Sequence, residues 1–326
     1  MALLQPQTSS VNGAASQEAY VPTASTSSPA RHAAKLPSVA KAVVFTEDEV
    51  AEYNRQLQDA TPMQILQWAT EHLPGLYQTT AFGLTGLAAL DMLSKISRQQ
   101  GYSKHQVPLI FIDTLYHFSE TLALAERASQ KYGAPMHVYY PPGVSSVAQF
   151  ESMYGKNLWE TDEDTYDYVV KVEPARRAYA ELDVKAVITG RRRSQGAQRA
   201  NIPIIEIDET GLIKVNPLAS WTFAETQTYI KENDVPYNAL LDRGYKSVGD
   251  WHSTKAPDGS VASGAGVDAD ERSGRWADRK ERSECGLHQN YFQMRKAFLK
   301  KQREREQLLK DEARQDDLPA STPPAI

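Results

Sequence analysis

The sequence predicts an α/β fold built on an open, mostly parallel sheet with helices on both of its faces. Short apolar runs typical of buried strands recur along the chain, and stretches with helical periodicity separate them. This alternation favours parallel strands, because each helix carries the chain back to the same end of the sheet. The composition, 41% hydrophobic and 24% charged, provides enough apolar residues for a sizeable core.

Five strands are expected in the central part of the chain. They occupy residues 77–81, 107–114, 136–140, 184–189 and 202–207. The helix after the first strand places Leu or Ile at every third position from Leu84 to Ile96. A second helix begins near Ser119 and ends at Gly133, a residue suited to a left-handed C-cap. A third is expected around residues 174–182.

Two further helices are expected before the first strand. Thr46 and Glu49 have the spacing of a capping box, in which each side chain bonds the backbone N–H of the other residue. Pro62 fits the first turn of the next helix, where a backbone N–H has no partner to lose.

Charge and cysteine content exclude several classes of protein. A net charge of -5 argues against a general nucleic-acid binder, which carries a basic surface. No apolar run reaches the roughly 18 residues of a membrane-spanning helix, and the first residues lack the pattern of a secretory signal. The single cysteine is too few for an internal disulfide, an iron–sulfur cluster or a structural zinc site. A cytoplasmic protein without a metal is therefore expected.

The chain divides into four expected segments. Residues 1–44, rich in Ser, Ala, Thr and Pro, are expected to be a disordered tail, although a transit peptide shares this composition. Residues 45–255 form the α/β domain. Residues 256–295 begin with a Gly-, Ala- and Ser-rich stretch and are expected to be a flexible arm. Residues 296–326 are expected to be a charged, solvated helix followed by a disordered tail.

Ligands of open α/β sheets bind beyond the carboxyl ends of the strands, and three loops of this sequence are expected there. The loop at residues 79–86 (TTAFGLTG) combines hydroxyls with glycines before a helix. Its backbone N–H groups are expected to hold an anion, the alternative being a plain turn. At the next strand end, Asp113 beside Thr114 is expected either to accept hydrogen bonds from a nucleoside or to cap the following helix.

The third loop is basic. Residues 190–196 (GRRRSQG) include Arg191, Arg192 and Gln195, with no acidic residue close by in the sequence. Guanidinium groups suit phosphate oxygens through paired hydrogen bonds, so this loop is expected to bind a polyanion. A solvated basic loop is the alternative. Arg176 and Arg177, just before the strand, either add charge to this site or lie on the surface.

Cys285 follows the flexible stretch in the polar segment ERSECGLH. A lone buried cysteine is commonly inert, but Lys280, Arg282 and His288 lie within a few residues of this one. A thiol with a pKa near 8.5 is about 3% ionised at pH 7, and nearby positive charge that lowers the pKa to about 7 makes it half ionised. The sequence therefore favours a reactive thiol at Cys285 over half of a metal site with His288.

Five motifs, taken in order along the chain, resemble those of 3′-phosphoadenylyl sulfate reductases. They are TTAFGLTG, IFIDTLYHFSET, VITGRRRSQGAQRA, NALLDRGYKSVGDWHST and ECGLH. The resemblance covers roughly residues 46–295 and is greatest to the cluster-free, single-cysteine branch familiar from fungi. It implies the adenine nucleotide α-hydrolase-like fold, with residues 45–255 as a nucleotide-binding domain and a mobile C-terminal arm carrying the cysteine.

The resemblance also implies the residues of the site. Those expected to bind the substrate are Thr79, Thr80, Phe82, Gly83, Thr85, Gly86, Asp113, Thr114, Arg191, Arg192, Gln195, Arg272 and Arg275. Those expected to take part in catalysis are Cys285, as the nucleophile, His288 and His252. Ala81 and Phe82 depart from the Ser-Gly-Gly-rich loops of ATP-splitting relatives, which argues against ATP hydrolysis.

The implied activity is the reduction of 3′-phosphoadenylyl sulfate to sulfite and adenosine 3′,5′-bisphosphate in assimilatory sulfate reduction. Attack by the Cys285 thiolate would leave a cysteine S-sulfonate, and with no second cysteine in the chain an external thiol must release sulfite. The family's usual donor is thioredoxin, with glutaredoxin as an alternative, and its usual state is a homodimer. No bound cofactor is expected.

Two other classes of function stay open. One is an ATP-dependent adenylating enzyme of the same fold, which would release pyrophosphate. The other is a non-catalytic nucleotide sensor, in which ECGLH would be a redox-sensitive segment. Release of sulfite that depends on a thiol would distinguish the reductase from both.

Overall fold

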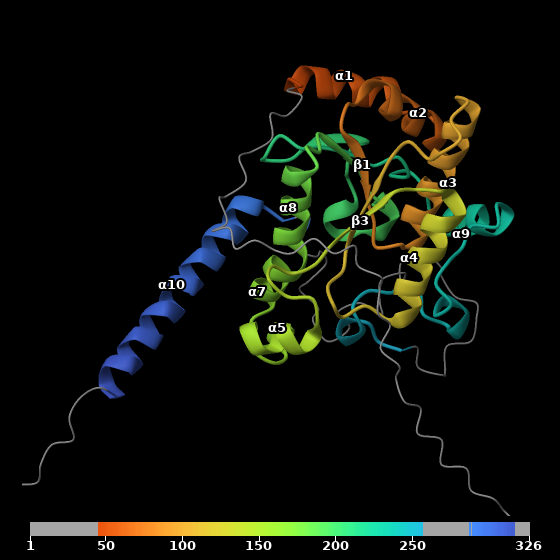
Figure 1. The fold of residues 1–326 in the computed structure, drawn as a ribbon. Helices are drawn as coiled ribbons and strands as arrows, with labels where there is room; N and C mark the ends of the chain where they lie inside the picture. The colour runs from red at the N-terminus through yellow and green to blue at the C-terminus, as the bar shows by residue number, and fades with distance from the viewer. Residues whose placement is uncertain (1–44, 257–286, 288, 317–326) are drawn as a thin grey trace, which may run out of the picture. The chain divides into compact units, whose positions relative to one another are not determined.

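The computed structural model describes residues 45–256, 287 and 289–316 of the chain (Figure 1). The expected disordered tail at residues 1–44 and most of the expected flexible arm lie outside the described residues. No helix among the residues described is both long enough and apolar enough to cross a membrane.

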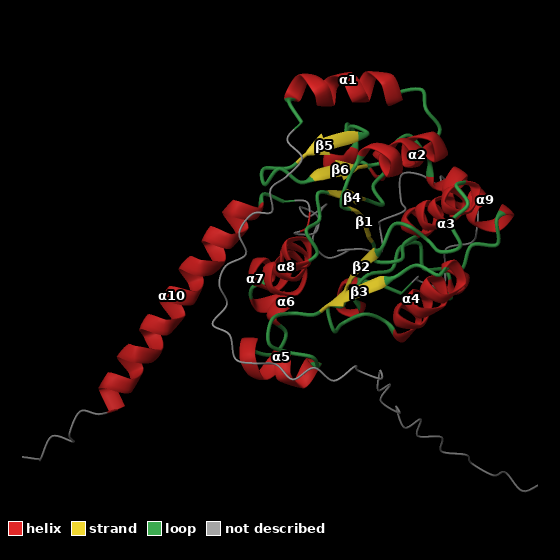
Figure 2. Ribbon diagram, turned by 45° about the horizontal axis from the view of Figure 1, so that its top comes forward, coloured by secondary structure: helices red, strands yellow, loops and turns green. Residues whose placement is uncertain are grey.

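Six strands form one sheet in the order β3-β2-β1-β4-β6-β5 (Figure 2). Their bounds are β1 (Leu76–Thr79), β2 (Leu109–Ile112), β3 (Met136–Tyr139), β4 (Ala186–Ile188), β5 (Ile205–Ile207) and β6 (Ile213–Val215). All pairs are parallel except β5 with β6. The predicted fold class is therefore confirmed. The sequence analysis did not predict β6, although β4 and β5 are equally short.

Helices cover both faces of the sheet. Successive side chains of a strand point to opposite faces and so belong to different hydrophobic cores. In β2, Leu109 and Phe111 belong to one core and Ile110 and Ile112 to another. The larger core lies under α2 (Pro62–His72), α3 (Leu84–Gln99), α4 (Ser119–Tyr132) and α9 (Phe223–Glu232). The smaller core lies under α8 (Glu173–Glu181).

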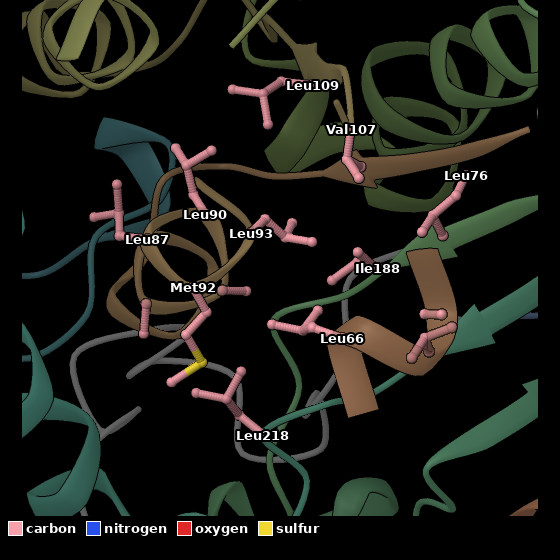
Figure 3. Close-up of a cluster of buried hydrophobic side chains, with 14 of the residues drawn as sticks. Leu66, Leu76, Leu87, Leu90, Met92, Leu93, Val107, Leu109, Ile188 and Leu218 are labelled. Atoms are coloured by element: carbon pink, nitrogen blue, oxygen red, sulfur yellow. The ribbon is translucent and has the colours of Figure 1, made fainter. Parts of the chain in front are cut away.

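The larger core is aliphatic and holds the strands against the helices (Figure 3). Leu66 of α2, Leu90 and Leu93 of α3 and Ile188 of β4 are buried together there. Burial of one such side chain stabilises the fold by about 1.5–3 kcal/mol. The regular spacing of Leu and Ile in α3 is thus the face that this helix packs on the sheet.

The predicted helix ends are confirmed. Thr46 precedes α1 (Glu47–Leu57), and its hydroxyl accepts from the Glu49 backbone N–H at 3.2 Å while Glu49 Oε2 accepts from the Thr46 N–H at 2.7 Å. Pro62 is the first residue of α2. Gly133 ends α4 in the left-handed conformation, with φ of 60°.

Strand β5 runs antiparallel to its neighbour because a short turn joins it to β6, and short turns join only antiparallel strands. Asp208 forms this turn by accepting hydrogen bonds from the backbone N–H groups of Thr210 and Leu212. The other side of β5 is an edge of the sheet and faces α1 (Figure 2). There Asn54 accepts from the N–H of Ile205 at 3.0 Å and donates to its carbonyl at 2.8 Å.

A helical region that the sequence analysis did not resolve connects β3 to α8. It contains α5 (Val147–Tyr154), α6 (Leu158–Thr161), α7 (Glu163–Asp167) and the π-helix η1 (Tyr168–Val172), which continues directly into α8. Its buried aromatic residues include Phe150, Trp159 and Tyr166, which gather around Tyr116. These side chains form a third hydrophobic cluster, here called the aromatic cluster, beside the carboxyl end of β2.

The charged C-terminal helix, α10 (Tyr291–Asp316), begins inside the segment that was expected to be a flexible arm. The first turns of α10 contact the aromatic cluster, since the Phe298 ring stacks on Tyr168 with 4.6 Å between centroids. Lys301 pairs with Asp162 at 2.7 Å. The high charge of this helix obscured the few apolar residues, such as Met294 and Phe298, with which it packs.

Candidate active site

A cavity of about 310 Å³ opens at the carboxyl ends of the parallel strands. The loops after β1, β2 and β4 line it, as the topology of an open α/β sheet favours. Nine residues expected to bind the substrate line this cavity: Thr79, Thr80, Phe82, Gly83, Thr85, Gly86, Thr114, Arg191 and Gln195. Asp113, Arg192 and His252 do not line it.

The loop after β1 brings its backbone close to the cavity. Phe82 adopts a positive φ of 56°, and its N–H donates to the Thr80 hydroxyl at 3.0 Å. Gly83 is the N-cap of α3 and provides no side-chain acceptor, so the first N–H groups of a 16-residue helix lie at the cavity wall. A helix N-terminus with unpaired N–H groups attracts anions.

Two glycines allow this loop to pack. A Cβ at Gly86 would lie 2.8 Å from the Thr80 hydroxyl, and a Cβ at Gly190 would lie 3.2 Å from the Gly86 nitrogen. The loops that follow β1 and β4 therefore meet backbone to backbone. This close approach explains why glycine stands at both strand ends.

Arg191 and Arg192 are adjacent in the chain but contact different parts of the structure. Arg191 lines the cavity and pairs with Glu206 of β5. Arg192 is completely buried and donates to the Thr85 hydroxyl at 3.0 Å and to Ser194 at 2.8 Å. Arg192 thus supports the start of α3, whereas the sequence analysis expected both arginines to bind the substrate.

Two further cations, Arg176 and Lys214, line the same cavity as Arg191. Arg176 of α8 and Lys214 of β6 both pair with Asp208, at 2.8 and 3.3 Å. Burial disfavours a charge on Asp208, but these two cations outweigh it and lower its pKa to about 2. Burial also lowers the pKa of Lys214, an effect that Asp208 opposes. The sequence analysis left Arg176 undecided and did not identify Lys214.

The two residues at the end of β2 also differ in their placement. The Asp113 carboxylate accepts from the Leu115 N–H at 2.9 Å, which forms a local turn and directs it away from the cavity. Thr114 lines the cavity, and its hydroxyl donates to Asp250 at 2.6 Å. The alternative that Asp113 caps the following helix is wrong, since Phe118 is the N-cap of α4.

Asp250 is the centre of a buried polar cluster that the sequence analysis missed. Its carboxylate lies 3.2 Å from Lys171 of η1 and 3.7 Å from His117, and all three residues line the cavity. Burial alone would raise the pKa of Asp250, but Lys171, His117, the Thr114 hydroxyl and His252 together hold it well below its usual range. This carboxylate is therefore ionised at neutral pH.

His252 lies behind this cluster instead of in the cavity. Its ring stacks on Trp159 with 4.3 Å between centroids, and its Nε2 lies 2.8 Å from the Tyr166 hydroxyl. The expected role of His252 in catalysis therefore stays a prediction. The expected residues Cys285, His288, Arg272 and Arg275 lie outside the described residues.

Two described residues of the C-terminal segment line the same cavity. They are Leu287, which also packs on the smaller core, and Gln289. Leu287 is the second residue after Cys285 in the motif ECGLH. The segment that carries the predicted nucleophile thus meets the cavity formed by the strand ends.

The chain is similar to known proteins over most of its length. The family model described as the phosphoadenosine phosphosulfate reductase domain matches residues 75–256. The phosphoadenosine phosphosulfate reductase of Emericella nidulans is 49% identical over 277 residues, 85% of this chain and 87% of that protein. The Saccharomyces cerevisiae enzyme of the same name is 50% identical over 254 residues, 76% of this chain and 92% of that protein.

A solved structure agrees with the sequence comparisons. The phosphoadenylyl-sulfate reductase of Candida auris, in a phosphate complex, is 48% identical and covers 65% of this chain and 98% of its own, with a TM-score of 0.59. The chain belongs to the phosphoadenosine phosphosulfate reductase family.

Proposed function

We propose that this protein reduces 3′-phosphoadenylyl sulfate to sulfite and adenosine 3′,5′-bisphosphate through a covalent intermediate on Cys285. The observation that carries the proposal is the single cavity shared by the loop at residues 79–86, by Arg191 and by Leu287. Two residues of chain span at most about 7 Å, so Leu287 limits how far the Cys285 Cα lies from its own. The loop expected to bind an anion and Leu287, two residues after Cys285 in the chain, therefore line the same cavity.

The charges of the cavity suit a substrate with two anionic groups. The N-terminus of α3 and the loop before it offer N–H donors for the phosphosulfate. Arg191, Arg176 and Lys214 offer positive charge for the 3′-phosphate. The apolar side chains of Val187 and Leu212, which also line the cavity, are suited to the adenine ring. The relative from Candida auris was solved as a phosphate complex, which agrees with anion binding.

The chemistry has two stages, and the substrate sulfur is reduced in both, first as it exchanges its bond to oxygen for a bond to Cys285 Sγ and then as it leaves with the electron pair of that bond. The Cys285 thiolate attacks the sulfate sulfur, the bond from that sulfur to the bridging oxygen breaks, and the electron pair leaves with adenosine 3′,5′-bisphosphate. A thiolate of the donor then attacks Cys285 Sγ and releases sulfite, which gives a mixed disulfide. A second donor thiol resolves that disulfide, so the donor supplies two electrons and the Cys285 thiol is restored.

This mechanism specifies the partners. The donor must carry two thiols, as thioredoxin does, and glutaredoxin is the alternative. No cofactor bound to the chain is needed, because thiols carry the electrons. Within the same proposal, Arg272, Arg275 and His288 approach the phosphosulfate together with Cys285. We further propose a homodimer in the cytoplasm, following the implied family properties.

The proposal is tested by stopping the reaction halfway. With substrate but no reductant, one nucleotide product should form per competent site and the protein should gain the mass of one sulfonate. Peptide mapping should locate that mass on Cys285, and reduced thioredoxin should remove it and release sulfite. The Cys285→Ser variant should bind adenosine 3′,5′-bisphosphate but form no sulfite.

Each rival function predicts a different result. Pyrophosphate release from ATP would indicate an adenylating enzyme, and nucleotide binding without any bond cleavage would indicate a sensor. Continued turnover without an external thiol, or an unmodified Cys285 after nucleotide release, would contradict the covalent mechanism.

A further inference from the structure

Asp250 joins three separate parts of the chain at the cavity wall. It forms an antiparallel bridge with His117 after β2, and the Trp251 N–H donates to the Tyr116 carbonyl at 2.9 Å. Its carboxylate reaches Lys171 of the π-helix η1 at 3.2 Å. With 2% exposure, Asp250 is among the most deeply buried charged residues of the described chain.

The groups around this carboxylate are hydrogen-bond donors. Thr114 donates to Oδ1 at 2.6 Å. Tyr166 donates to Oδ2 at 3.3 Å, and the Lys171 ammonium lies near the same oxygen. An ionised carboxylate can accept from all of them, whereas an amide would direct an N–H group at one of the donors. The site therefore requires a carboxylate and not merely a polar side chain of this size.

Lys171 is the member of this cluster that brings positive charge to the cavity. Its ammonium is held between Asp250 and Asp167, the latter at 2.8 Å, while the residue itself lines the cavity. A lysine side chain loses considerable rotational freedom when it is fixed, and two carboxylates can hold it in one place. Lys171 lies in a π-helix, a rare local geometry found frequently at functional sites.

We propose that Asp250 is a positioning residue, which holds the Lys171 ammonium at the cavity wall where it meets the anionic end of the substrate. The inference rests on the proposed function. It separates two roles within the motif GDWHST, in which the sequence analysis selected His252. Asp250 contacts the cavity-lining cation directly, whereas His252 packs behind it against Trp159 and Tyr166.

The test compares Asp250→Asn with a matched control elsewhere in the fold. Asp91 of α3 is also buried, pairs with Lys95 at 2.6 Å and accepts from the Tyr229 hydroxyl at 2.6 Å, but it does not line the cavity. Both variants should lose stability. In single-turnover experiments, Asp250→Asn should slow S-sulfonate formation at least tenfold with little change in affinity for adenosine 3′,5′-bisphosphate. Asp91→Asn should react within about twofold of the parent.

A double-mutant cycle separates positioning from a general structural effect. If Asp250 acts through Lys171, the Asp250→Asn/Lys171→Met protein should react at the rate of Lys171→Met alone. Independent effects would instead multiply. Should Asp250→Asn fail to fold, Asp250→Glu takes its place in the cycle, because it keeps the buried charge but displaces the carboxylate relative to the Lys171 ammonium.

The outcomes distinguish this inference from the proposed function. A parent protein that forms no S-sulfonate would refute the proposed function. A parent that reacts, together with an Asp250→Asn variant of parental rate, would refute the positioning role. A double variant slower than Lys171→Met by the full factor of Asp250→Asn would refute it as well.

Discussion

The different contacts of Arg191 and Arg192 predict that the same substitution at adjacent positions has different consequences. Arg191→Ala removes a cation that lines the cavity. A hydrogen bond to a charged group contributes about 1.5–3 kcal/mol, which corresponds to about a tenfold to hundredfold rise in KM. If Arg191 binds the 3′-phosphate, this loss should affect 3′-phosphoadenylyl sulfate and should largely spare adenylyl sulfate, which lacks that phosphate.

Arg192→Ala should act on the fold instead. The variant removes a completely buried side chain together with its bonds to Thr85 and Ser194, so the free energy of unfolding should fall by about 2–4 kcal/mol. Because Thr85 lies in the first turn of α3, both substrates should lose activity to a similar extent.

The assay is the rate of sulfite formation with each of the two nucleotides, at saturating thioredoxin, combined with urea unfolding of each variant. The ratio of the two KM values should change in Arg191→Ala and stay constant in Arg192→Ala. An equal rise for both substrates in Arg191→Ala would mean that Arg191 holds the shared phosphosulfate. A substrate-selective effect of Arg192→Ala in a stable protein would refute the orientation of that side chain.

Two further predictions concern stability. Phe298→Ala should lower the free energy of unfolding by about 1–2 kcal/mol, because it removes the ring stacked on Tyr168, and unchanged urea unfolding would show that α10 does not stabilise the domain. The fold lowers the pKa of Asp208 from its ordinary value of 3.8 to about 2, so its ionised form contributes about 2 kcal/mol above pH 4, and that contribution is lost as the pH falls from about 4 to 2. The difference in stability between the parent and Asp208→Asn should therefore shrink between pH 5 and pH 3, and a constant difference over that range would contradict the ion-pair assignment.

The sequence predicted those parts of the fold that depend on local pattern. The spacing of Leu and Ile in α3, the capping box at Thr46 and Glu49 and the apolar run of β2 are each readable over a few residues. By contrast, the helices α5, α6 and α7 have only 8, 4 and 5 residues and carry too little periodicity to be recognised. The antiparallel direction of β5 depends on the turn at Asp208, which a strand pattern alone does not reveal.

The candidate site shows the same division. The loop at residues 79–86 was identified because its hydroxyls, glycines and following helix are contiguous in the sequence. Lys171 and Asp250 are far apart in the chain, and their contact at 3.2 Å exists only in the fold. A signal was nevertheless present, since Asp167 and Lys171 form an i, i+4 pair within an otherwise apolar stretch. Which of the two arginines lines the cavity and which packs against Thr85 depends on the folded backbone, and the composition of the loop does not reveal it.

The contact between Asn54 and β5 has a consequence for how the molecule behaves at high concentration. An exposed edge strand can recruit a strand from another molecule and so begin aggregation. The Asn54 amide accepts from the N–H of Ile205 and donates to its carbonyl, the same two groups that an incoming strand would use. Loss of this side chain would therefore reduce the yield of soluble protein.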